Sequence, residues 1–339
     1  MNMDEIITLS HGSGGKKSSE LIESLFYKHL GNDLLLQRHD STVLPPIHGR
    51  PVMTTDSFVI QPLFFPGGDI GKLAVCGTVN DIAMSGARPL YISLALIIEE
   101  GLPLAELEAI IISIARAAEE AGVYVVTGDT KVVNRGAADK LFINTTGVGV
   151  IEDGRTISGS NAHIGDKIII SGTIGDHGTT IMAERQNLGV TSDLKSDCAV
   201  LSNLIRDCLN VSGEIHVLRD PTRGGVAATL NEIAADSAVT ITLDESSLPV
   251  KESVQALNEI LGLDPLYCAN EGKFLTFVSA EDADAVLETM RMNPLGVDAA
   301  VIGEVCESDD SQHRVIVNTH IGGRRIVHMP AGELLPRIC

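Results

Sequence analysis

The sequence predicts a mixed α/β protein built from two domains. Its 339 residues exceed the size at which a single hydrophobic core usually keeps growing. Runs of β-branched residues alternate along the chain with segments whose apolar residues recur at helical spacing. A stretch rich in Gly, Ser and Asn between Gly154 and Gly165 separates two such halves. We therefore expect one domain over residues 1–155, a second over 156–329 and a flexible tail over 330–339.

The N-terminal half begins with a glycine-rich loop and then alternates helices and strands. Its clearest helix opens at Pro103, because Leu107, Ile111 and Ile114 recur on one helical face, and Gly122 ends it. The expected elements of this half are helices over 18–30, 70–85 and 103–121, and strands over 52–60, 91–98, 123–127 and 142–151.

The C-terminal half repeats the mixed pattern. Its expected helices cover 179–186, 193–209, 225–235, 250–261 and 282–291, and its expected strands cover 167–171, 239–243, 274–278, 300–305, 315–317 and 325–329. Cys198 and Cys208 share a face of the predicted 193–209 helix with Leu201 and Ile205, which identifies them as small core residues.

Composition narrows the class of protein. The formal net charge of −20 argues against a nucleic-acid partner, which would require clustered Lys and Arg. The six cysteines form no C-x-x-C pair, so we expect no structural zinc and a reducing, cytoplasmic environment. The first residues lack the features of a signal peptide, and the apolar run from Leu90 to Ile98 is too short to span a bilayer.

A loop of His11-Gly-Ser-Gly-Gly-Lys16 precedes the first predicted helix. It has the glycine content of a phosphate cradle but not the spacing of a P-loop, and a flexible N-terminal loop is the alternative. A second such turn, Asp220-Pro-Thr-Arg-Gly-Gly225, comes directly before a predicted helix, where backbone N–H groups can approach an anion.

Four isolated aspartates stand at the ends of predicted elements: Asp56, Asp81, Asp129 and Asp220. Each alone has a structural explanation, such as capping a helix. Together, and without His or Cys ligands, they suit Mg²⁺, which prefers carboxylate oxygens, water and nucleotide phosphates. Four cations could balance phosphate charge, namely Lys16, Lys72, Lys131 and Arg223. The residues therefore indicate an ATP–Mg²⁺ site that is not of the P-loop kind.

The last ten residues, from Pro330 to Cys339, form the predicted tail. Gly332 loosens its backbone, while Pro330 and Pro336 disfavour a helix or a strand. Seven extended residues span roughly 25 Å, enough to carry a thiol into a cleft. A thiolate is a nucleophile and a group carrier, so Cys339 is either a swinging carrier or the last residue of a frayed end.

Four motifs occur in an order that resembles a known superfamily. They are Thr54-Thr-Asp56-Ser-Phe58, Gly77-Thr-Val-Asn80-Asp81, Thr127-Gly-Asp129-Thr130 and Asp220-Pro-Thr-Arg-Gly-Gly225. This order resembles the aminoimidazole ribonucleotide synthetase superfamily, which includes selenophosphate synthetase and thiamine monophosphate kinase. Gly-Asp-Thr-Lys131, Cys268-Ala-Asn-Glu271 and the ending Pro336-Arg-Ile-Cys339 are similar to the HypE family of hydrogenase maturation factors. The resemblance covers essentially the whole chain.

The resemblance implies a two-domain PurM-like fold whose first sheet pairs with its mate across a dimer. It implies ATP and Mg²⁺ as cofactors, with metal at Asp56, Asp81, Asp129 and Asp220. The residues expected at the nucleotide are Gly12, Gly14, Gly15, Lys16, Lys72, Thr78, Asn80, Thr127, Gly128, Thr130, Thr222 and Arg223. The implied partners are the carbamoyltransferase HypF and the iron-carrying HypC–HypD complex.

The implied reaction is the ATP-dependent dehydration of a carboxamide carried on Cys339 to a thiocyanate, the source of the cyanide ligands of [NiFe]-hydrogenase. Phosphorylation turns the amide oxygen into a leaving group. Loss of the nitrogen protons then requires a base, for which Glu271 is the candidate, while Lys131 would orient the carboxamide. The alternative is that Glu271 and Lys131 only pair with each other. Cys268 is interpreted as structural.

Two other functions compete with this interpretation. ATP could activate a small molecule, as in selenophosphate synthesis, but residues 11–17 lack the reactive cysteine expected of such an enzyme. The chain could also be a scaffold whose tail is a docking peptide, although the complete acidic set argues against an inactive site.

Overall fold

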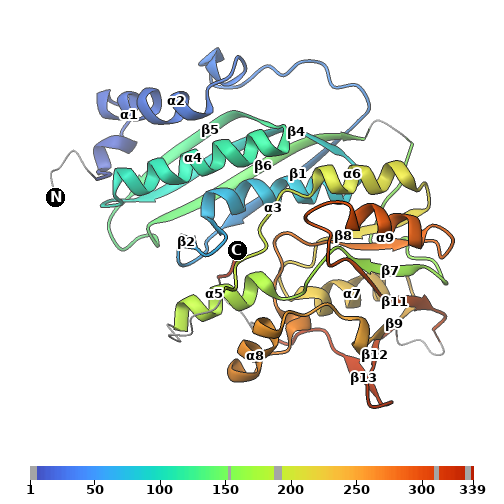
Figure 1. The fold of residues 1–339 in the computed structure, drawn as a ribbon. Helices are drawn as coiled ribbons and strands as arrows, with labels where there is room; N and C mark the ends of the chain where they lie inside the picture. Colours follow the sequence, from blue (N-terminus) through green and yellow to red (C-terminus); the bar gives the residue numbers. More distant parts are fainter. Residues whose placement is uncertain (1–5, 152–153, 187–192, 309–312, 333–336) are drawn as a thin grey trace.

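The computed structural model describes residues 6–151, 154–186, 193–308, 313–332 and 337–339. The middle of the predicted tail, 333–336, lies outside the described residues. Figure 1 shows two α/β halves, each with its own sheet, and places the C-terminus between them, beside α5 and β2. The predicted fold class is therefore confirmed. None of the described helices combines the length and the apolarity needed to cross a membrane.

A four-stranded sheet organises the first half, in the order β1-β6-β4-β5. Its strands are β1 (Arg50–Phe58), β4 (Arg88–Glu99), β5 (Tyr124–Val133) and β6 (Leu141–Ile151). Only β4 and β5 are parallel, because α4 (Leu104–Ala121) connects them as a crossover. The helices α3 (Ile70–Met84) and α4 pack side by side over one face of this sheet (Figure 1).

The two covering helices follow from local sequence signals. Asp69 caps α3, since its Oδ1 accepts hydrogen bonds from Gly71 N at 2.7 Å and Lys72 N at 3.1 Å. Pro103 precedes α4, and Gly122 ends it in the left-handed conformation at φ 67°. The predicted bounds of both helices are confirmed to within a residue.

A seven-stranded sheet organises the second half, in the order β13-β12-β9-β11-β7-β10-β8. Its strands are β7 (Lys167–Ile170), β8 (Ile215–Arg219), β9 (Thr240–Asp244), β10 (Leu275–Val278), β11 (Ala300–Cys306), β12 (Val315–Asn318) and β13 (Arg324–Val327). Its helices are α5 (Asp176–Gln186), α6 (Ser202–Val211), α7 (Gly225–Asp236), α8 (Glu252–Leu261) and α9 (Ala283–Arg291).

Short elements complete the described chain. They are η1 (Leu9–Gly12), α1 (Lys16–Leu21), η2 (Ile22–Tyr27), α2 (Lys28–Leu30), η3 (Leu35–Gln37), the hairpin of β2 (Phe64–Phe65) and β3 (Gly68–Asp69), η4 (Glu245–Ser247) and η5 (Pro265–Tyr267). The single helix predicted over 18–30 is thus three consecutive pieces that begin at Lys16, with a π-helical turn in the middle.

Two further predictions were wrong, and one strand was missed. The strand predicted over 123–127 continues to Val133, so the Thr127–Thr130 motif lies inside β5 rather than after it. The helix predicted over 193–209 begins only at Ser202, so Cys198 and Leu201 precede it, although both are buried. The strand β8 was missed, because five residues between a helix and a glycine-rich turn carry too little periodicity.

Candidate active site

The C-terminal residues lie in a cavity of about 430 Å³ between the two halves of the molecule. Ser57 and Val59 line it from the end of β1, and Arg223 and Gly224 line it from the turn before α7. Cys339 lines it from the C-terminus. The structure therefore shows residues 337–339 in an inward position, with Cys339 partly buried.

Four contacts hold the last three residues in place. Val59 N donates to the main-chain oxygen of Cys339 at 3.1 Å, and the His177 ring contacts the Ile338 carbonyl at 2.7 Å. Arg337 forms an ion pair with Asp139, and its carbonyl accepts a hydrogen bond from Arg185. The Ile338 side chain is 2% exposed and packs in the core of the first half.

Three aspartates lie near one another, since Asp81 and Asp220 each have a pKa raised by neighbouring aspartates. Asp56 lies on β1 and Asp81 on α3, two elements that pack together, and Thr54 on β1 donates to Asp81 Oδ2 at 3.1 Å. Asp220 directly follows β8. Asp56 and Asp81 are inside their elements, and Asp129 is inside β5, so the prediction that all four stand at element ends was wrong for these three.

Burial and mutual repulsion raise the pKa values of two of these aspartates. Burial, and then the carboxylates of Asp81 and Asp56, raise the pKa of Asp220 to about 7. Burial is also the main cause that raises the pKa of Asp81, with Asp56 adding to it. Three hard oxygen donors whose mutual repulsion favours protonation fit a divalent cation such as Mg²⁺, which would relieve that repulsion.

Glu271 is buried and affects the pKa of the Cys339 thiol. The residue is only 4% exposed, and its Oε1 has no hydrogen-bond partner among the described residues. Burial, followed by Cys198, Asp197 and Asp220, raises its pKa well above the ordinary value. Burial, followed by Glu271, likewise raises the pKa of Cys339 to about 12. The two groups therefore interact electrostatically, and one oxygen of the buried Glu271 carboxyl has no partner among the described residues.

Lys131 and Asp129 lie elsewhere. Lys131 Nζ is 2.6 Å from both oxygens of Asp129, so it pairs with Asp129 and not with Glu271. Asp56, Thr145, Leu94 and Gly128 form one row across the sheet, and Thr145 contacts α3. The alternate rows, which include Asp129 and Lys131, project from the opposite face. Within one chain these two residues therefore do not lie on the face of the sheet that carries Asp56.

A second cavity of about 650 Å³ lies between the N-terminal helices and the edge strand β5. The glycine-rich loop lines it through Gly12 and Gly14, and Thr127–Lys131 line it from β5. Gly12 packs closely on β5, since a Cβ there would lie 2.8 Å from Val132 N. Gly15 is the N-terminal cap of α1, and Lys16 is exposed and pairs with Glu20 at 3.6 Å.

The remaining candidate nucleotide ligands have structural contacts. Thr78 Oγ1 lies 2.5 Å from Thr145 Oγ1, which joins α3 to β6. Asn80 donates to Ala199 O at 3.0 Å and accepts from Leu201 N at 2.9 Å. Lys72 Nζ donates to Gly67 O, and the backbone of Thr222 forms the turn that leads into α7. Arg223 lines the tail cavity.

Sequence reasoning missed the residues that hold the tail and the acid in place. They are His177, Ser196 and Asp197. His177 is completely buried at the start of α5. The glycines on either side, in Gly175-Asp-His-Gly178, are a sequence signal that could have pointed to it. Asp197 accepts hydrogen bonds from Glu271 N at 3.3 Å and Gly272 N at 3.0 Å, and no spacing rule connects positions so far apart.

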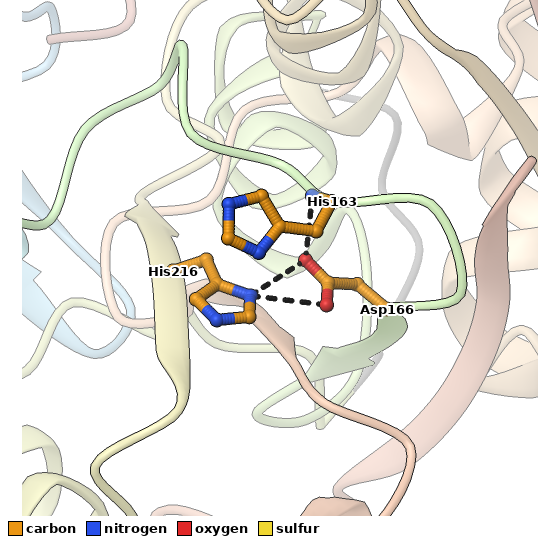
Figure 2. Close-up of side chains that lie close together, drawn as sticks. All are labelled: His163, Asp166 and His216. Carbon is orange, nitrogen blue, oxygen red and sulfur yellow. Dashed lines mark hydrogen bonds and ion pairs between the residues drawn. The ribbon is translucent and has the colours of Figure 1, made fainter.

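Figure 2 shows a separate cluster of His163, Asp166 and His216, whose possible ligand atoms lie within 4.8 Å of one another. Both oxygens of Asp166 already receive N–H donors. His216 Nδ1 is 3.0 and 2.9 Å from them, and the His163 main-chain N is 2.9 Å from Oδ2. These contacts attach the loop before β7 to the edge strand β8, so we assign the cluster a structural role.

Comparison with known proteins places this geometry in a family. The model of the AIR synthase related protein N-terminal domain matches residues 38–151, and that of the C-terminal domain matches 163–316. Carbamoyl dehydratase HypE of Bradyrhizobium diazoefficiens is 53% identical over 334 residues, which cover 98% of this chain and 96% of that protein. A crystal structure of hydrogenase maturation protein HypE in complex with ATP has a TM-score of 0.94 at 49% identity, covering 98% and 99% of the two chains.

A crystal structure of a HypE–HypF complex also matches, with a TM-score of 0.80 at 49% identity, covering 91% of this chain and 99% of that one. These matches extend over both halves of the molecule and confirm the resemblance carried by the acidic motifs. The chain therefore belongs to the HypE family of carbamoyl dehydratases, within the AIR synthase related proteins.

Proposed function

We propose that this protein uses ATP to dehydrate a carboxamide on the sulfur of Cys339 to a thiocyanate, which supplies cyanide for the iron of [NiFe]-hydrogenase. The observation that carries the proposal is the inward position of Cys339, which lines the cavity between the two halves and whose thiol pKa is affected by Glu271, Arg223 and Asp56. The names of the relatives and the ATP complex of one of them support the same reaction.

The reaction consists of two steps. The carboxamide oxygen attacks the γ-phosphorus of ATP, ADP leaves, and one N–H proton is lost, which gives an S-bound imidate phosphate. The second N–H proton then leaves, the C–O bond breaks, and phosphate departs as the C≡N bond forms. Glu271 is the proposed base for proton removal, because its raised pKa makes its ionised form a stronger base than an ordinary glutamate.

The aspartates have a separate role. Asp56, Asp81 and Asp220 would hold Mg²⁺, which supplies neutralisation of the charge on the transferred phosphoryl group. Arg223 lines the tail cavity and lowers the pKa of Asp81, so its positive charge acts on the aspartates. Because Asp220 contributes to the raised pKa of Glu271, a cation at Asp220 would also favour the ionised form of Glu271. Charge neutralisation and activation of the base are therefore linked.

The cavity beneath the glycine-rich loop is proposed to take part in ATP binding. Gly12, Gly14 and the Thr127–Thr130 segment line it, and its volume of about 650 Å³ lies in the range of small-molecule sites. We propose that Lys16 and Lys72 approach the phosphates when the nucleotide binds. Asp129 is proposed as an additional metal ligand and Lys131 as the group that orients the carboxamide.

Three protein partners follow from the proposal. HypF would load the carbamoyl group, as the HypE–HypF complex of a relative supports, and HypC–HypD would receive the cyanide. A second copy of this chain would pack on the uncovered face of the four-stranded sheet, where Met53 on β1 is 71% exposed and Ile97 on β4 is 43% exposed. Exposed apolar side chains on a regular sheet face favour such an interface.

Intact-mass measurement tests the reaction directly. After incubation with the carbamoyltransferase, carbamoyl phosphate and ATP, Cys339 should gain a carbamoyl group and then lose the mass of water only when ATP is present. Glu271→Gln should keep the loading step and slow the loss of water by about 10²–10⁴-fold, because it removes the base. An adduct that persists in Cys339→Ala, or water loss without ATP, would show that the proposed function is wrong.

A further inference from the structure

One buried histidine connects the docked tail to the rest of the site. His177 is 0% exposed and lies at the start of α5. Its Nε2 is 2.7 Å from the Ile338 carbonyl oxygen, and its Nδ1 is 2.8 Å from Ser196 Oγ. The Phe65 ring meets the imidazole edge-on, with the ring centres 5.6 Å apart. The imidazole therefore has defined contacts on both of its nitrogens and with a neighbouring ring.

The chemistry of these partners determines the direction of each hydrogen bond. A carbonyl oxygen only accepts hydrogen bonds, so His177 Nε2 is protonated and donates a hydrogen bond to the Ile338 carbonyl oxygen. Burial lowers the pKa of His177, so the ring is neutral and its Nδ1 accepts from the Ser196 hydroxyl. The Ser196 oxygen in turn accepts from Cys198 N at 3.1 Å. A directed chain thus runs from Cys198 through Ser196 and His177 to the tail.

The same short segment also holds the candidate base. Asp197 stands between Ser196 and Cys198, and its carboxylate accepts from the main-chain N–H groups of Glu271 and Gly272 at 3.3 and 3.0 Å. Lys273 Nζ lies 3.5 Å from the same carboxylate. Residues 196–198 therefore fasten both the loop that carries Glu271 and, through His177, the tail that carries Cys339.

We infer that His177 is a positioning residue that latches the tail inward and sets the thiol of Cys339 against Glu271. The inference deepens the proposed function and rests on it for the meaning of the inward position. The latch contacts the main chain of residue 338 and not the thiol, so it holds the tail whether or not the sulfur carries a carbamoyl group. It leaves the sulfur free to react while its distance from the base is maintained.

Alkylation of Cys339 tests the latch without ATP or the carbamoyl donor, so its result stands even if the dehydratase proposal fails. His177→Phe keeps a ring but removes both hydrogen bonds, which should increase the alkylation rate of Cys339 by about tenfold. His177→Gln can donate to Ile338 and accept from Ser196, so it should stay within about threefold of the parent protein. Peptide mass spectrometry separates Cys339 from Cys306, the other partly exposed cysteine.

Cys306 serves as the internal reference for folding. The surface substitution His320→Phe is the matched control, since His320 is exposed and its ring pairs with Glu245 at 2.7 Å, at the protein surface. If His177→Phe also raises the alkylation rate of Cys306, the substitution has destabilised the whole fold. The test then uses Ser196→Ala instead. That variant removes one hydroxyl and should raise the rate at Cys339 alone by about threefold or more. No change at Cys339 in either variant, with the fold intact, would overturn the latch.

A second readout separates positioning from a general loss of structure. With the carbamoyltransferase present, His177→Phe should load Cys339 at least as fast as the parent protein, because its tail is outward more often. Its single-turnover loss of water should be slower by about tenfold, in line with the docked population lost. His177→Gln should recover most of the water-loss rate. Equal slowing of both steps would contradict the latch.

Discussion

At the scale of single residues, the acidic cluster lowers the stability of the protein at neutral pH. Asp220 has its pKa raised from 3.8 to about 7 by burial and by Asp81 and Asp56. Because the folded pKa lies above the unfolded one, the carboxyl costs no stability at low pH. The cost develops as the pH rises and is complete above about pH 7. Metal-binding residues commonly carry such a cost, which is removed when the cation arrives.

The substitution Asp220→Asn should therefore stabilise the metal-free protein. We expect the free energy of unfolding at pH 8 to rise by roughly 1–4 kcal/mol and the gain to shrink toward zero as the pH falls to about 4. Urea unfolding at several pH values without Mg²⁺ measures this difference. Adding Mg²⁺ should stabilise the parent protein and not the variant. Asp207→Asn, at an exposed position, is the control, and an equal effect of pH on both variants would contradict the prediction.

At the scale of secondary-structure elements, close approach of two turns positions the base. Gly225 opens α7 at φ 62°, and a Cβ there would lie 2.5 Å from Cys268 O and 2.6 Å from Leu266 O. The start of α7, which borders the tail cavity, therefore rests against the turn that leads to Glu271. Only glycine permits both the backbone conformation and the contact.

Gly225→Ala is expected to push these two turns apart. It should lower the free energy of unfolding by about 2–4 kcal/mol, because it combines left-handed backbone strain with a backbone clash. Gly213→Ala is the matched control, since a Cβ at Gly213 meets no atom within 4 Å, and its effect should stay within about 0.5 kcal/mol. Thermal unfolding of both variants checks the prediction. Similar unfolding of the two variants would show that the contact at Gly225 is not tight.

The elements also show how far sequence reasoning reaches. Helical spacing together with Pro103 and Gly122 was enough for α4, because each signal acts locally. The same reasoning misplaced the start of α6. Residues 196–201 are kept out of the helix by distant partners, including Asn80, which accepts from Leu201 N, and the Glu271 loop, which donates to Asp197. A hydrogen bond between positions so far apart leaves no periodicity in either segment.

The site divides in the same way. Motif order predicted Asp56, Asp81 and Asp220, whose mutual effect on pKa the structure shows. It did not predict that Asp129 and Lys131 point from the other face of the sheet, since facing depends on the register between strands. The register pairs Asp56 with Thr145, and Ala95 with Asp129. The relation of one motif to another is set by strand pairing, which a single sequence does not display.

At the scale of the whole molecule, the position of Lys131 bears on assembly. In one chain Lys131 lies on β5, three strands from β1, which corresponds to about 14 Å across the sheet. It also projects from the uncovered face, away from α3 and Asp56. The tail, in contrast, docks on its own chain, beside Val59 at the end of β1. A two-fold axis running along the strands, between two uncovered faces, would set β5 of one copy against β1 of the other.

This arrangement predicts that Lys131 serves the tail of the partner copy. Lys131→Ala and Cys339→Ala should each abolish water loss when pure. Refolded together in equal amounts, they form mixed dimers as half of all dimers, and each mixed dimer has one complete site. About half of the Cys339-bearing subunits should then lose water, which is a quarter of the yield from the same total amount of parent protein. Single-turnover mass spectrometry of the Cys339-bearing subunit measures the recovery.

The mixture of Glu271→Gln with Cys339→Ala is the control and should recover nothing, because Glu271 and the tail on which it acts belong to one chain. If mixed dimers form but the Lys131 mixture recovers no activity, Lys131 acts on the tail of its own chain. In that case β5 must approach the tail by a movement within the protomer.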